Sequence, residues 1–293
     1  DKEETIFAHC GKISNKHVAL QIGQALHADA RRKGCSSDMF VNNTLVSMYG
    51  KCGNLDYAQK VFDKIPQCNL ITWNALIASY ANLGRRKKAL MLFDQMLWEG
   101  MTPTEPTFVG LLNAFAEPAA LADGERIHCI IISCGYGLDV IVGNALINMY
   151  GKCGSLSFAR SIFDKMLDRD VISWTSLMAG YIKCECFDDV TNYFECMRFE
   201  GVVPNSVTFV CVLKACGSTG AIEIGENIHD IIVRMRLLEN DIVLGTALVD
   251  MYGKCGILAK AKMVLEELPE RNTISWNALL AGYSQHGQGY EAL

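Results

Sequence analysis

The sequence lacks any uninterrupted run of about 18 or more apolar residues, so we expect no membrane-spanning helix. The first ten residues, DKEETIFAHC, also lack the basic region and the apolar stretch of a signal peptide, so we do not expect a targeting segment within this chain. Hydrophobic residues nevertheless make up 50% of the 293 residues. That share is enough to bury a large core, and the length would ordinarily suggest one large domain or two smaller ones.

The Cys-x-x-Cys spacing that is typical of structural zinc sites is also missing, although the chain has 13 cysteines. The closest pair, Cys184 and Cys186, is separated by a single residue. Unpaired cysteines in a long apolar chain favour reduced thiols in a reducing compartment, where cysteine packs as a small hydrophobic residue. We therefore expect no metal site and no cofactor.

Positive charge is not in excess, because 27 Lys and Arg face 32 Asp and Glu and the net charge is −5. Proteins that bind nucleic acid by bulk attraction are usually basic, so such binding would depend here on local placement of charge. Catalytic motifs are missing as well: the sequence has no Gly-x-x-x-x-Gly-Lys, His-Glu-x-x-His or Gly-x-Ser-x-Gly string and no zinc deaminase signature. We expect no catalytic residue and no enzymatic activity in this chain.

What the chain does have is an internal repeat of about 101 residues. The string YGKCG begins at Tyr49, Tyr150 and Tyr252, at intervals of 101 and 102 residues. Tryptophans and histidines keep nearly the same intervals, at Trp73, Trp174 and Trp276 and at His27, His128 and His229. Residues repeated at this distance in an extended repeat protein do not converge on one active site.

Each unit of about 101 residues divides into helical hairpins, in which an apolar segment is followed by an amphipathic one. The second segments carry apolar residues at helical spacing, as in Ala58, Val61, Phe62 and Ile65. A single hairpin cannot bury its apolar faces, whereas stacked hairpins can, so we predict an all-α solenoid of tandem helix-turn-helix repeats. The predicted hairpins are 4–38, 39–69, 70–104, 105–139, 140–170, 171–205, 206–241, 242–272 and a shortened 273–293.

Two runs that are strand-like by propensity, FVGLL and VTFVCVL, open hairpins in the same register as WNALI, and we predict helices there. In the YGKCG string beginning at Tyr150, we expect the tyrosine to close the first helix and Gly151 and Gly154 to shape the turn. Cys153 is expected to be a packed thiol.

The alternation of 35, 31 and 35 residues resembles the PLS class of plant pentatricopeptide repeat (PPR) proteins, in which long, short and standard repeats follow one another. The matching strings are NALINMYGKCGSLSFARSIFDKM, DVISWTSLMAGY, GVVPNSVTFVCVLKACGSTGAIEIGENIH and ISWNALLAGYSQHG. The resemblance covers essentially the whole chain. It makes 4–38, 105–139 and 206–241 long repeats, 39–69, 140–170 and 242–272 short repeats, and 70–104, 171–205 and 273–293 standard repeats.

The resemblance implies a right-handed superhelix that binds single-stranded RNA, one base per repeat, in a plant mitochondrion or chloroplast. It further implies site selection for C-to-U editing, with a deaminase domain or partner and multiple organellar RNA editing factors as possible associates. A different possibility from the residues is a protein–protein interaction scaffold, since helical-hairpin solenoids are widely used as docking platforms.

In the family, the fifth and last residues of a repeat read the base. The fifth residues of the short and standard repeats are all Asn or Thr: Asn43, Asn74, Asn144, Thr175, Thr246 and Asn277. The long repeats have Ala8, Val109 and Val210 there. A polar side chain within an apolar helix costs free energy unless it is satisfied, so this recurrence favours a binding role, and both Asn and Thr can donate and accept hydrogen bonds.

The last residues of the repeats are all Asp, Asn or Thr: Asp38, Asn69, Thr104, Asp139, Asp170, Asn205, Asp241 and Asn272. Helix N-capping is the alternative for these residues, and the residues alone favour it, although the two roles are compatible. By the family's code the pairs suggest C for Asn43 with Asn69, a pyrimidine for Asn74 with Thr104 and U for Asn144 with Asp170. Thr175 with Asn205 and Thr246 with Asn272 suggest A, so the expected target resembles 5′-n-C-Y-n-U-A-n-A-3′.

Two further rows follow from the same register. The family places an apolar residue at position two against the base faces, which gives Phe40, Ile71, Ile141, Ile172, Val243 and Ile274 here. Core packing is the alternative for these side chains, and the residues alone favour it.

Lysine recurs at position thirteen, at Lys16, Lys51, Lys152, Lys183 and Lys254. A single lysine is usually just solvated, but a row of them suggests contacts with phosphates.

Overall fold

The computed structural model describes residues 16–34, 38–239 and 241–288, with side chains from Val18 onward. All regular elements in these ranges are helices, and they contain no strand. The chain divides into two compact units, Asp1–Gly137 and Leu138–Leu293, each of which is described separately. None of the described helices is both long and apolar enough to cross a membrane.

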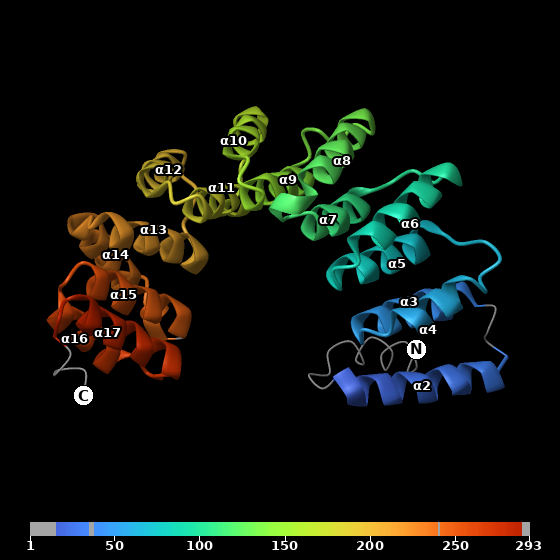
Figure 1. Cartoon of the computed structure of the whole chain (residues 1–293), viewed down its shortest axis with the longest axis horizontal. Coiled ribbons are helices and arrows are strands. Elements are labelled where there is room, and N and C mark those ends of the chain that lie inside the picture. Colours follow the sequence, from blue (N-terminus) through green and yellow to red (C-terminus); the bar gives the residue numbers. More distant parts are fainter. Residues whose placement is uncertain (1–15, 35–37, 240, 289–293) are drawn as a thin grey trace. The chain divides into compact units, whose positions relative to one another are not determined.

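The first unit consists of helices joined by short turns (Figure 1). The helices are α2 (Lys16–Arg32), α3 (Met39–Lys51), α4 (Leu55–Phe62), α5 (Leu70–Asn82), α6 (Arg86–Trp98), α7 (Glu105–Ala114), the 3₁₀ turn η2 (Pro118–Ala120) and α8 (Leu121–Ser133). Successive pairs α3–α4, α5–α6 and α7–α8 form hairpins. The strand-like run FVGLL lies within α7, as predicted.

The second unit continues the same plan. Its helices are α9 (Val140–Lys152), α10 (Leu156–Lys165), α11 (Val171–Lys183), α12 (Phe187–Phe199), α13 (Ser206–Thr219), α14 (Ile222–Arg234), the 3₁₀ turn η3 (Leu237–Glu239), α15 (Ile242–Lys254), α16 (Leu258–Glu267) and α17 (Thr273–Gln285). The second strand-like run, VTFVCVL, is helical in α13, so this prediction is also correct.

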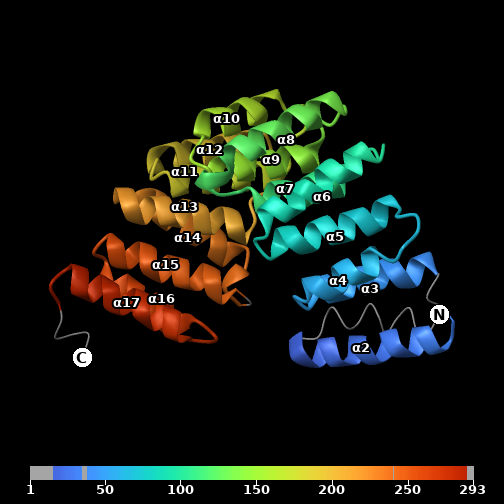
Figure 2. The same ribbon diagram turned by 45° about the vertical axis from the view of Figure 1, so that its right-hand side comes forward.

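The helices of each unit pack in two layers. The first helices of successive hairpins contact one another, α3 with α5 and α5 with α7 in the first unit, and α9 through α11, α13 and α15 to α17 in the second. Within a unit, a second helix contacts its own partner and the first helix of the next hairpin, as α4 contacts α3 and α5 and α12 contacts α11 and α13. The side-by-side first helices are visible in both views (Figures 1 and 2). Stacked helical hairpins are thus confirmed within each unit.

The 31-residue hairpins are short because their second helices are short. Helices α4, α10 and α16 have 8, 10 and 10 residues, whereas α6, α8, α12 and α14 have 13 each. The predicted apolar stripes of these short helices are buried, including Ala58, Phe62, Phe163 and Leu265. Phe62 and Phe163 each meet a tryptophan of the next hairpin edge-on, with ring centroids 4.7 Å apart at Trp73 and Trp174. These contacts bury the apolar stripe between neighbouring hairpins.

Candidate nucleic-acid interface

A row of apolar side chains at the second position of the hairpins is exposed. Phe40, Ile71, Ile141, Ile172, Val243 and Ile274 are between 52% and 68% exposed. Core packing, the alternative that the sequence favoured, is therefore wrong for all six. Val207 is 58% exposed at the same position of its hairpin, and its register could have revealed it. Since large apolar residues at one register are not needed for the fold when they face solvent, they are candidates for ligand contact.

In the first unit this row borders an open hollow of about 580 Å³ between α3 and α5. Phe40 and Ile71 line it from the second position, and Asn43 and Asn74 from the fifth. Lys51, at position thirteen, lines it as well and is exposed. The hollow thus brings together side chains from three predicted rows, one apolar, one polar and one cationic.

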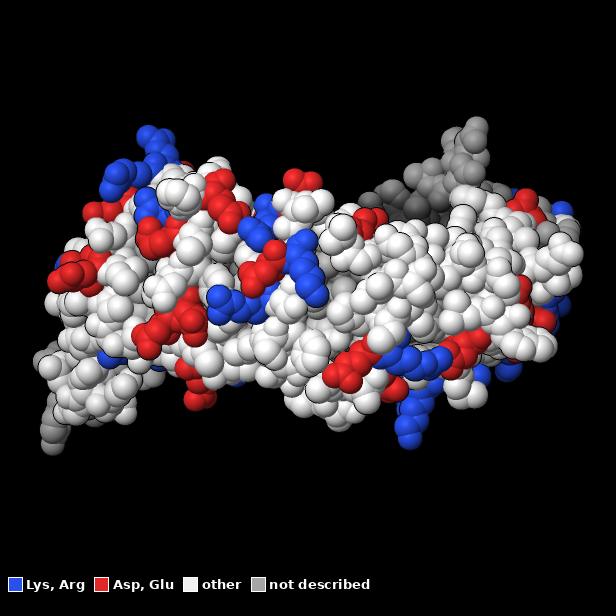
Figure 3. Space-filling view, turned by 90° about the horizontal axis from the view of Figure 1, so that it is seen from above, with Lys and Arg blue, Asp and Glu red and all other residues white. Residues whose placement is uncertain are grey.

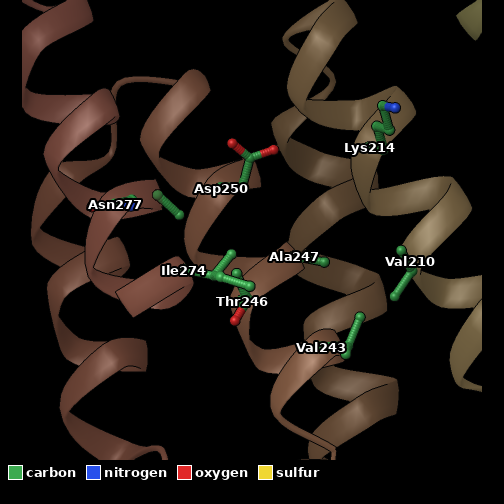
Figure 4. Close-up of a pocket in the computed structure, with 9 residues that line it drawn as sticks. Val210, Lys214, Val243, Thr246, Ala247, Asp250, Ile274 and Asn277 are labelled. Carbon is green, nitrogen blue, oxygen red and sulfur yellow. The ribbon is translucent and has the colours of Figure 1, made fainter. Parts of the chain in front are cut away.

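A hollow of about 420 Å³ in the second unit is lined by the same apolar and polar rows, but the position-thirteen Lys254 does not line it. Figure 4 shows Val243 and Thr246 of α15 with Ile274 of α17 around it, and Val210 approaching from α13. Asn277, whose side chain is exposed, completes the fifth-position row. Because both hollows are lined by the second, fifth, sixth and ninth positions of successive hairpins, they follow from the repeat register. Their volumes lie within the range that small organic groups occupy in proteins.

Asn43 and Asn74 are hydrogen-bonded to the next hairpin. The Thr72 hydroxyl of α5 shares its single hydrogen between two acceptors, Asn43 Oδ1 at 2.5 Å and Asn69 Oδ1 at 2.8 Å from Thr72 Oγ1. The Thr107 hydroxyl of α7 donates to Asn74 Oδ1 at 2.6 Å. The fifth and last residues are thus linked through a third residue, which satisfies polar groups that would otherwise be costly within an apolar helix.

Asn144 is linked to its last residue directly. Its Nδ2 donates to Asp170 Oδ1 at 3.0 Å, and the same carboxylate oxygen accepts from the backbone N–H and the hydroxyl of Ser173. Burial alone would raise the pKa of the Asp170 carboxyl, but the hydrogen bonds from Ser173 and Asn144 together lower it below its usual value. Asn144 is 7% exposed, and its Oδ1 is buried with no hydrogen-bond partner among the described residues.

The two fifth-position threonines behave differently. Thr175 Oγ1 donates to the carbonyl oxygens of Val171 and Ile172, at 2.8 and 3.1 Å, and Thr246 Oγ1 donates to that of Ile242 at 2.8 Å. Their hydroxyl hydrogens are used within their own helices. Hydrogen bonds therefore link the fifth and last residues in two of these hairpins, Asn43 with Asn69 through Thr72 and Asn144 with Asp170 directly. Among the described residues, no such link is present between Thr175 and Asn205 or between Thr246 and Asn272.

N-capping by the last residues is confirmed at seven positions. One side-chain oxygen of each accepts from the backbone N–H three residues on, at 2.8 to 3.1 Å, in Asp38, Asn69, Asp139, Asp170, Asn205, Asp241 and Asn272. At Thr104 the backbone N–H instead donates to Thr107 Oγ1 at 3.1 Å. Capping engages one oxygen of each side chain, so it is compatible with a second role for the remaining carboxylate oxygen or amide nitrogen.

The sequence interpretation missed the buried hydroxyls at the third position of the hairpins. Thr72, Thr107, Ser173, Thr208 and Ser275 are at most 1% exposed and take part in these caps. Their signal was present in the sequence as a Ser or Thr three residues after five of the eight caps, Asn69, Thr104, Asp170, Asn205 and Asn272. The short hairpins have Val41, Val142 and Leu244 at this position.

The predicted lysine row divides by environment. Lys51 and Lys152 are exposed, and the exposed Lys183 donates to the Lys152 carbonyl oxygen at the end of α9. Lys254 is paired with Asp250 at 2.7 Å, and the side chain of Lys16 lies outside the described residues. One face of the molecule shows Lys and Arg interspersed with Asp and Glu (Figure 3). On this face an anionic ligand meets locally placed cations and not a continuous basic surface.

In the YGKCG string, every residue except the lysine has a structural role. Tyr49 and Tyr252 are buried, and their hydroxyls lie 2.9 Å from Nδ1 of His27 and His229. Burial raises the pKa of both tyrosines to about 12. Gly154 has a φ of +80° and ends its helix, as predicted. The prediction that Gly151 shapes the turn is wrong, because it lies buried within α9, against α11.

The described residues contain no group of three or more His, Cys, Asp and Glu that could hold a metal ion. Their stacked helical hairpins, with side chains of one kind recurring at one register, define a helical-repeat protein. The chain belongs to the pentatricopeptide repeat family. The family model described as PPR repeat matches residues 43–70, 144–171, 246–273 and 274–293, and that described as PPR repeat family matches 68–117 and 169–218.

Two relatives from Arabidopsis thaliana illustrate the similarity. The mitochondrial pentatricopeptide repeat-containing protein At3g09040 is 38% identical over 282 residues, which cover 96% of this chain and 27% of the relative. The chloroplastic pentatricopeptide repeat-containing protein At1g11290 is 35% identical over 274 residues, which cover 94% of this chain and 34% of the relative. The chain therefore spans about a third or less of the length of either protein.

Solved structures support the fold. The maize pentatricopeptide repeat protein PPR10 superposes with a TM-score of 0.76 at 20% identity, covering 96% of this chain and 41% of PPR10. PPR10 in complex with an 18-nucleotide psaJ RNA element gives a TM-score of 0.75 at 19% identity, covering 96% and 42%. At this identity the likeness establishes the solenoid fold alone.

Proposed function

We propose that this array binds single-stranded RNA in a sequence-specific manner, with one base per hairpin. The observation that carries the proposal is the exposed apolar row at the second position, next to polar fifth residues in hollows of both units. An apolar side chain on either side of a hollow can contact the faces of a base, while Asn or Thr meets its edge. PPR10, a family member of the same fold, has been solved in complex with RNA.

The finer assignment treats the hairpins as long, short and standard repeats and the array as the recognition part of an organellar RNA-processing factor. Its role would be site selection for C-to-U editing, with deamination supplied by another domain or a partner. Relatives named as mitochondrial and chloroplastic support an organellar location. The fifth and last residues then specify a target resembling 5′-n-C-Y-n-U-A-n-A-3′.

The acidic net charge is compatible with RNA binding if the contacts with phosphates are few and local. Lys51 and Lys152 occupy the same register in the two units, and both are exposed. Lys254 is held by Asp250, so it would contribute less. Each phosphate that a cation neutralises releases roughly one counterion, and the salt dependence of the affinity grows with the number of such phosphates. With few cations in this register, the affinity should depend on salt only modestly.

A protein-docking scaffold is the second candidate, and one observation favours it. Trp98 at the end of α6 and Phe199 at the end of α12 occupy equivalent positions of their hairpins and are 89% and 94% exposed. Both belong to second helices, whereas the hollows are lined by first helices. A partner could therefore bind there without displacing RNA.

The test is a titration of the proposed RNA oligomer against a scrambled RNA of the same composition, single-stranded DNA and duplex RNA, across a salt series. Preference for the proposed RNA would support the assignment of bases. Equal affinity for the proposed and scrambled RNA would disprove the code, and no preference for single-stranded RNA over the other two would favour the scaffold.

A further inference from the structure

The hydroxyl groups at the third position of the hairpins do more than cap helices at the asparagine sites. Thr72 Oγ1 lies between two side chains of the preceding hairpin and shares its single hydrogen between Asn43 Oδ1 at 2.5 Å, the shorter contact, and Asn69 Oδ1 at 2.8 Å. Capping requires only the contact between the Asn69 side chain and the Thr72 backbone N–H, which is 2.9 Å long. The bond to Asn43 is therefore additional, and it connects the cap to the predicted base-reading side chain.

The second asparagine of the first unit repeats this arrangement. Thr107 Oγ1 donates to Asn74 Oδ1 at 2.6 Å, and it also accepts from the backbone N–H of Thr104 at 3.1 Å. A hydroxyl has a single hydrogen, so using it on Asn74 fixes which end of the amide faces the threonine. In both hairpins the amide oxygen faces the neighbouring hairpin, and the NH₂ group is left for a ligand.

In the second unit the amide of Asn144 is reversed. Its NH₂ group donates to Asp170 Oδ1 at 3.0 Å, and Ser173 holds that carboxylate by a hydroxyl hydrogen bond of 3.0 Å and a backbone hydrogen bond of 2.8 Å. A carboxylate can only accept, so it can pair only with the NH₂ end of Asn144. The other end of the amide, Asn144 Oδ1, is buried and has no hydrogen-bond partner among the described residues. The Asn144 residue as a whole is only 7% exposed.

Among the described residues, these two orientations leave opposite hydrogen-bonding groups of the amide without a partner, the NH₂ group of Asn43 and Asn74 and the oxygen of Asn144. An amide NH₂ group donates, and it complements the N3 atom of cytosine, which is an acceptor. An amide oxygen accepts, and it complements the N3–H group of uracil, which is a donor. An unsatisfied buried acceptor such as Asn144 Oδ1 gains a full hydrogen bond from the right base and remains unpaired with the wrong one, which is how polar sites discriminate most strongly.

We propose that the third residue of each following hairpin is a positioning residue that determines the base preference of the asparagine before it. Thr72 and Thr107 hold Asn43 and Asn74 as donors and favour cytosine over uracil. Ser173 holds Asp170 so that Asn144 is an acceptor and favours uracil. The proposal rests on the RNA-binding function proposed above and extends it from two reading residues per hairpin to three.

The hairpin that contains Thr175 supplies a matched control. The third-position hydroxyl of the hairpin after it, that of Thr208, makes no hydrogen bond to Thr175 in the described part of the chain. Thr208 Oγ1 donates to Asn205 Oδ1 at 3.0 Å, while Thr175 donates to the Val171 carbonyl of its own helix. Thr208 is as buried as Thr72 and caps its helix in the same way. Valine is compatible with the fold at this position, since Val41 and Val142 occupy it in the short hairpins.

The experiment compares the whole chain with its Thr72→Val and Thr208→Val variants, using RNAs that differ only by C or U at the nucleotide assigned to hairpin 39–69. We expect Thr72→Val to reduce the ratio of the C and U affinities by about 3- to 10-fold, the value of one hydrogen bond. Thr208→Val should leave this ratio unchanged, and Thr72→Ser should restore it. A merely structural effect would instead weaken binding of both RNAs equally and lower the melting temperature of both valine variants alike.

Ser173→Ala provides the reciprocal measurement, with RNAs that differ by U or C at the nucleotide assigned to hairpin 140–170. We expect its preference for U to fall by a similar factor. An unchanged C-to-U ratio in Thr72→Val, or an equal change in Thr208→Val, would overturn the positioning role while leaving RNA binding intact. Failure of the unaltered chain to bind either RNA would overturn the proposed function itself, and so the two failures are distinguishable.

Discussion

Gly151 of α9 lies so close to Gly180 of α11 that a Cβ atom added to Gly151 would be 2.9 Å from the Cα of Gly180. Gly253 and Gly282 are related in the same way in the next pair of first helices, at 3.3 Å. Close-packed interiors do not accommodate an extra methyl group between two backbones. The first glycine of YGKCG therefore sets how closely a short hairpin approaches the next one, and with it the spacing of the side-chain rows that we propose to bind RNA.

The first prediction concerns this contact. Gly151→Ala should lower the free energy of unfolding by about 1 to 3 kcal/mol, because the new methyl group would overpack one backbone against another. Urea unfolding followed by circular dichroism measures the change. Gly110→Ala is the control, since a Cβ there would be 3.7 Å from its nearest neighbour, the Ala78 side chain. It should be neutral or stabilising by up to about 1 kcal/mol, and an equal loss in both variants would refute the role of the close approach.

The second prediction tests the exposed apolar row. Ile71→Ala should weaken RNA binding by about fivefold, because it removes an apolar contact of about 1 kcal/mol with a base. The melting temperature should hardly change, since Ile71 is 64% exposed. Fluorescence anisotropy with the proposed RNA measures the affinity. Ile132→Ala on α8, a second helix, removes a side chain that is 59% exposed and should leave affinity unchanged.

The third prediction concerns the cations. Lys51→Gln and Lys152→Gln should each weaken the binding of all RNA sequences to a similar extent and reduce the slope of log affinity against log salt by about 0.7 to 1. Lys87→Gln alters an exposed lysine of α6, a second helix, and should change neither quantity. A loss that depends on sequence would show that these lysines contact bases and not phosphates.

The fourth prediction is a pH dependence of stability. Burial lowers the pKa of His229 from 6.5, and the same cause, reinforced by Arg31 and Lys64, lowers that of His27. The charged groups that act on His229 are Asp230, Glu267, Lys260 and Glu226. A histidine with a lowered folded-state pKa binds fewer protons when folded than when unfolded. Its stabilisation is therefore complete above about pH 6.5 and is lost as the pH falls through the folded-state pKa.

Urea midpoints at pH 7.5 and 5.0 measure this effect. The unaltered chain should lose more stability on acidification than His229→Gln, because the variant lacks the titrating group beside the Tyr252 hydroxyl. Equal losses in the two proteins would show that His229 does not contribute and that carboxyl groups account for the dependence.

Much of the fold could be predicted because its determinants are local. Helical spacing placed Ala58, Val61 and Phe62 on one buried stripe, and Asp, Asn and Thr marked helix starts such as Asn69 and Asp170. Both features depend on residues within one or two turns of each other. The positions of the candidate site within each hairpin could be predicted for the same reason. Residues at one position of every hairpin lie on the same side of the stacked first helices.

The sequence by itself determined the hairpins, their caps and the residues that share a register. Only the tertiary structure decided that Phe40 and Ile71 face solvent, that Gly151 packs against Gly180 and that the amides of Asn43 and Asn144 are held in opposite orientations. The amide orientations depend on atoms that lie 26 to 29 residues away along the chain, at the end of the same hairpin or in the next one, and no local pattern contains them. The hydrogen bonds from Thr72 and Ser173 illustrate the reason, since an amide can face either way until a neighbour supplies a donor or an acceptor.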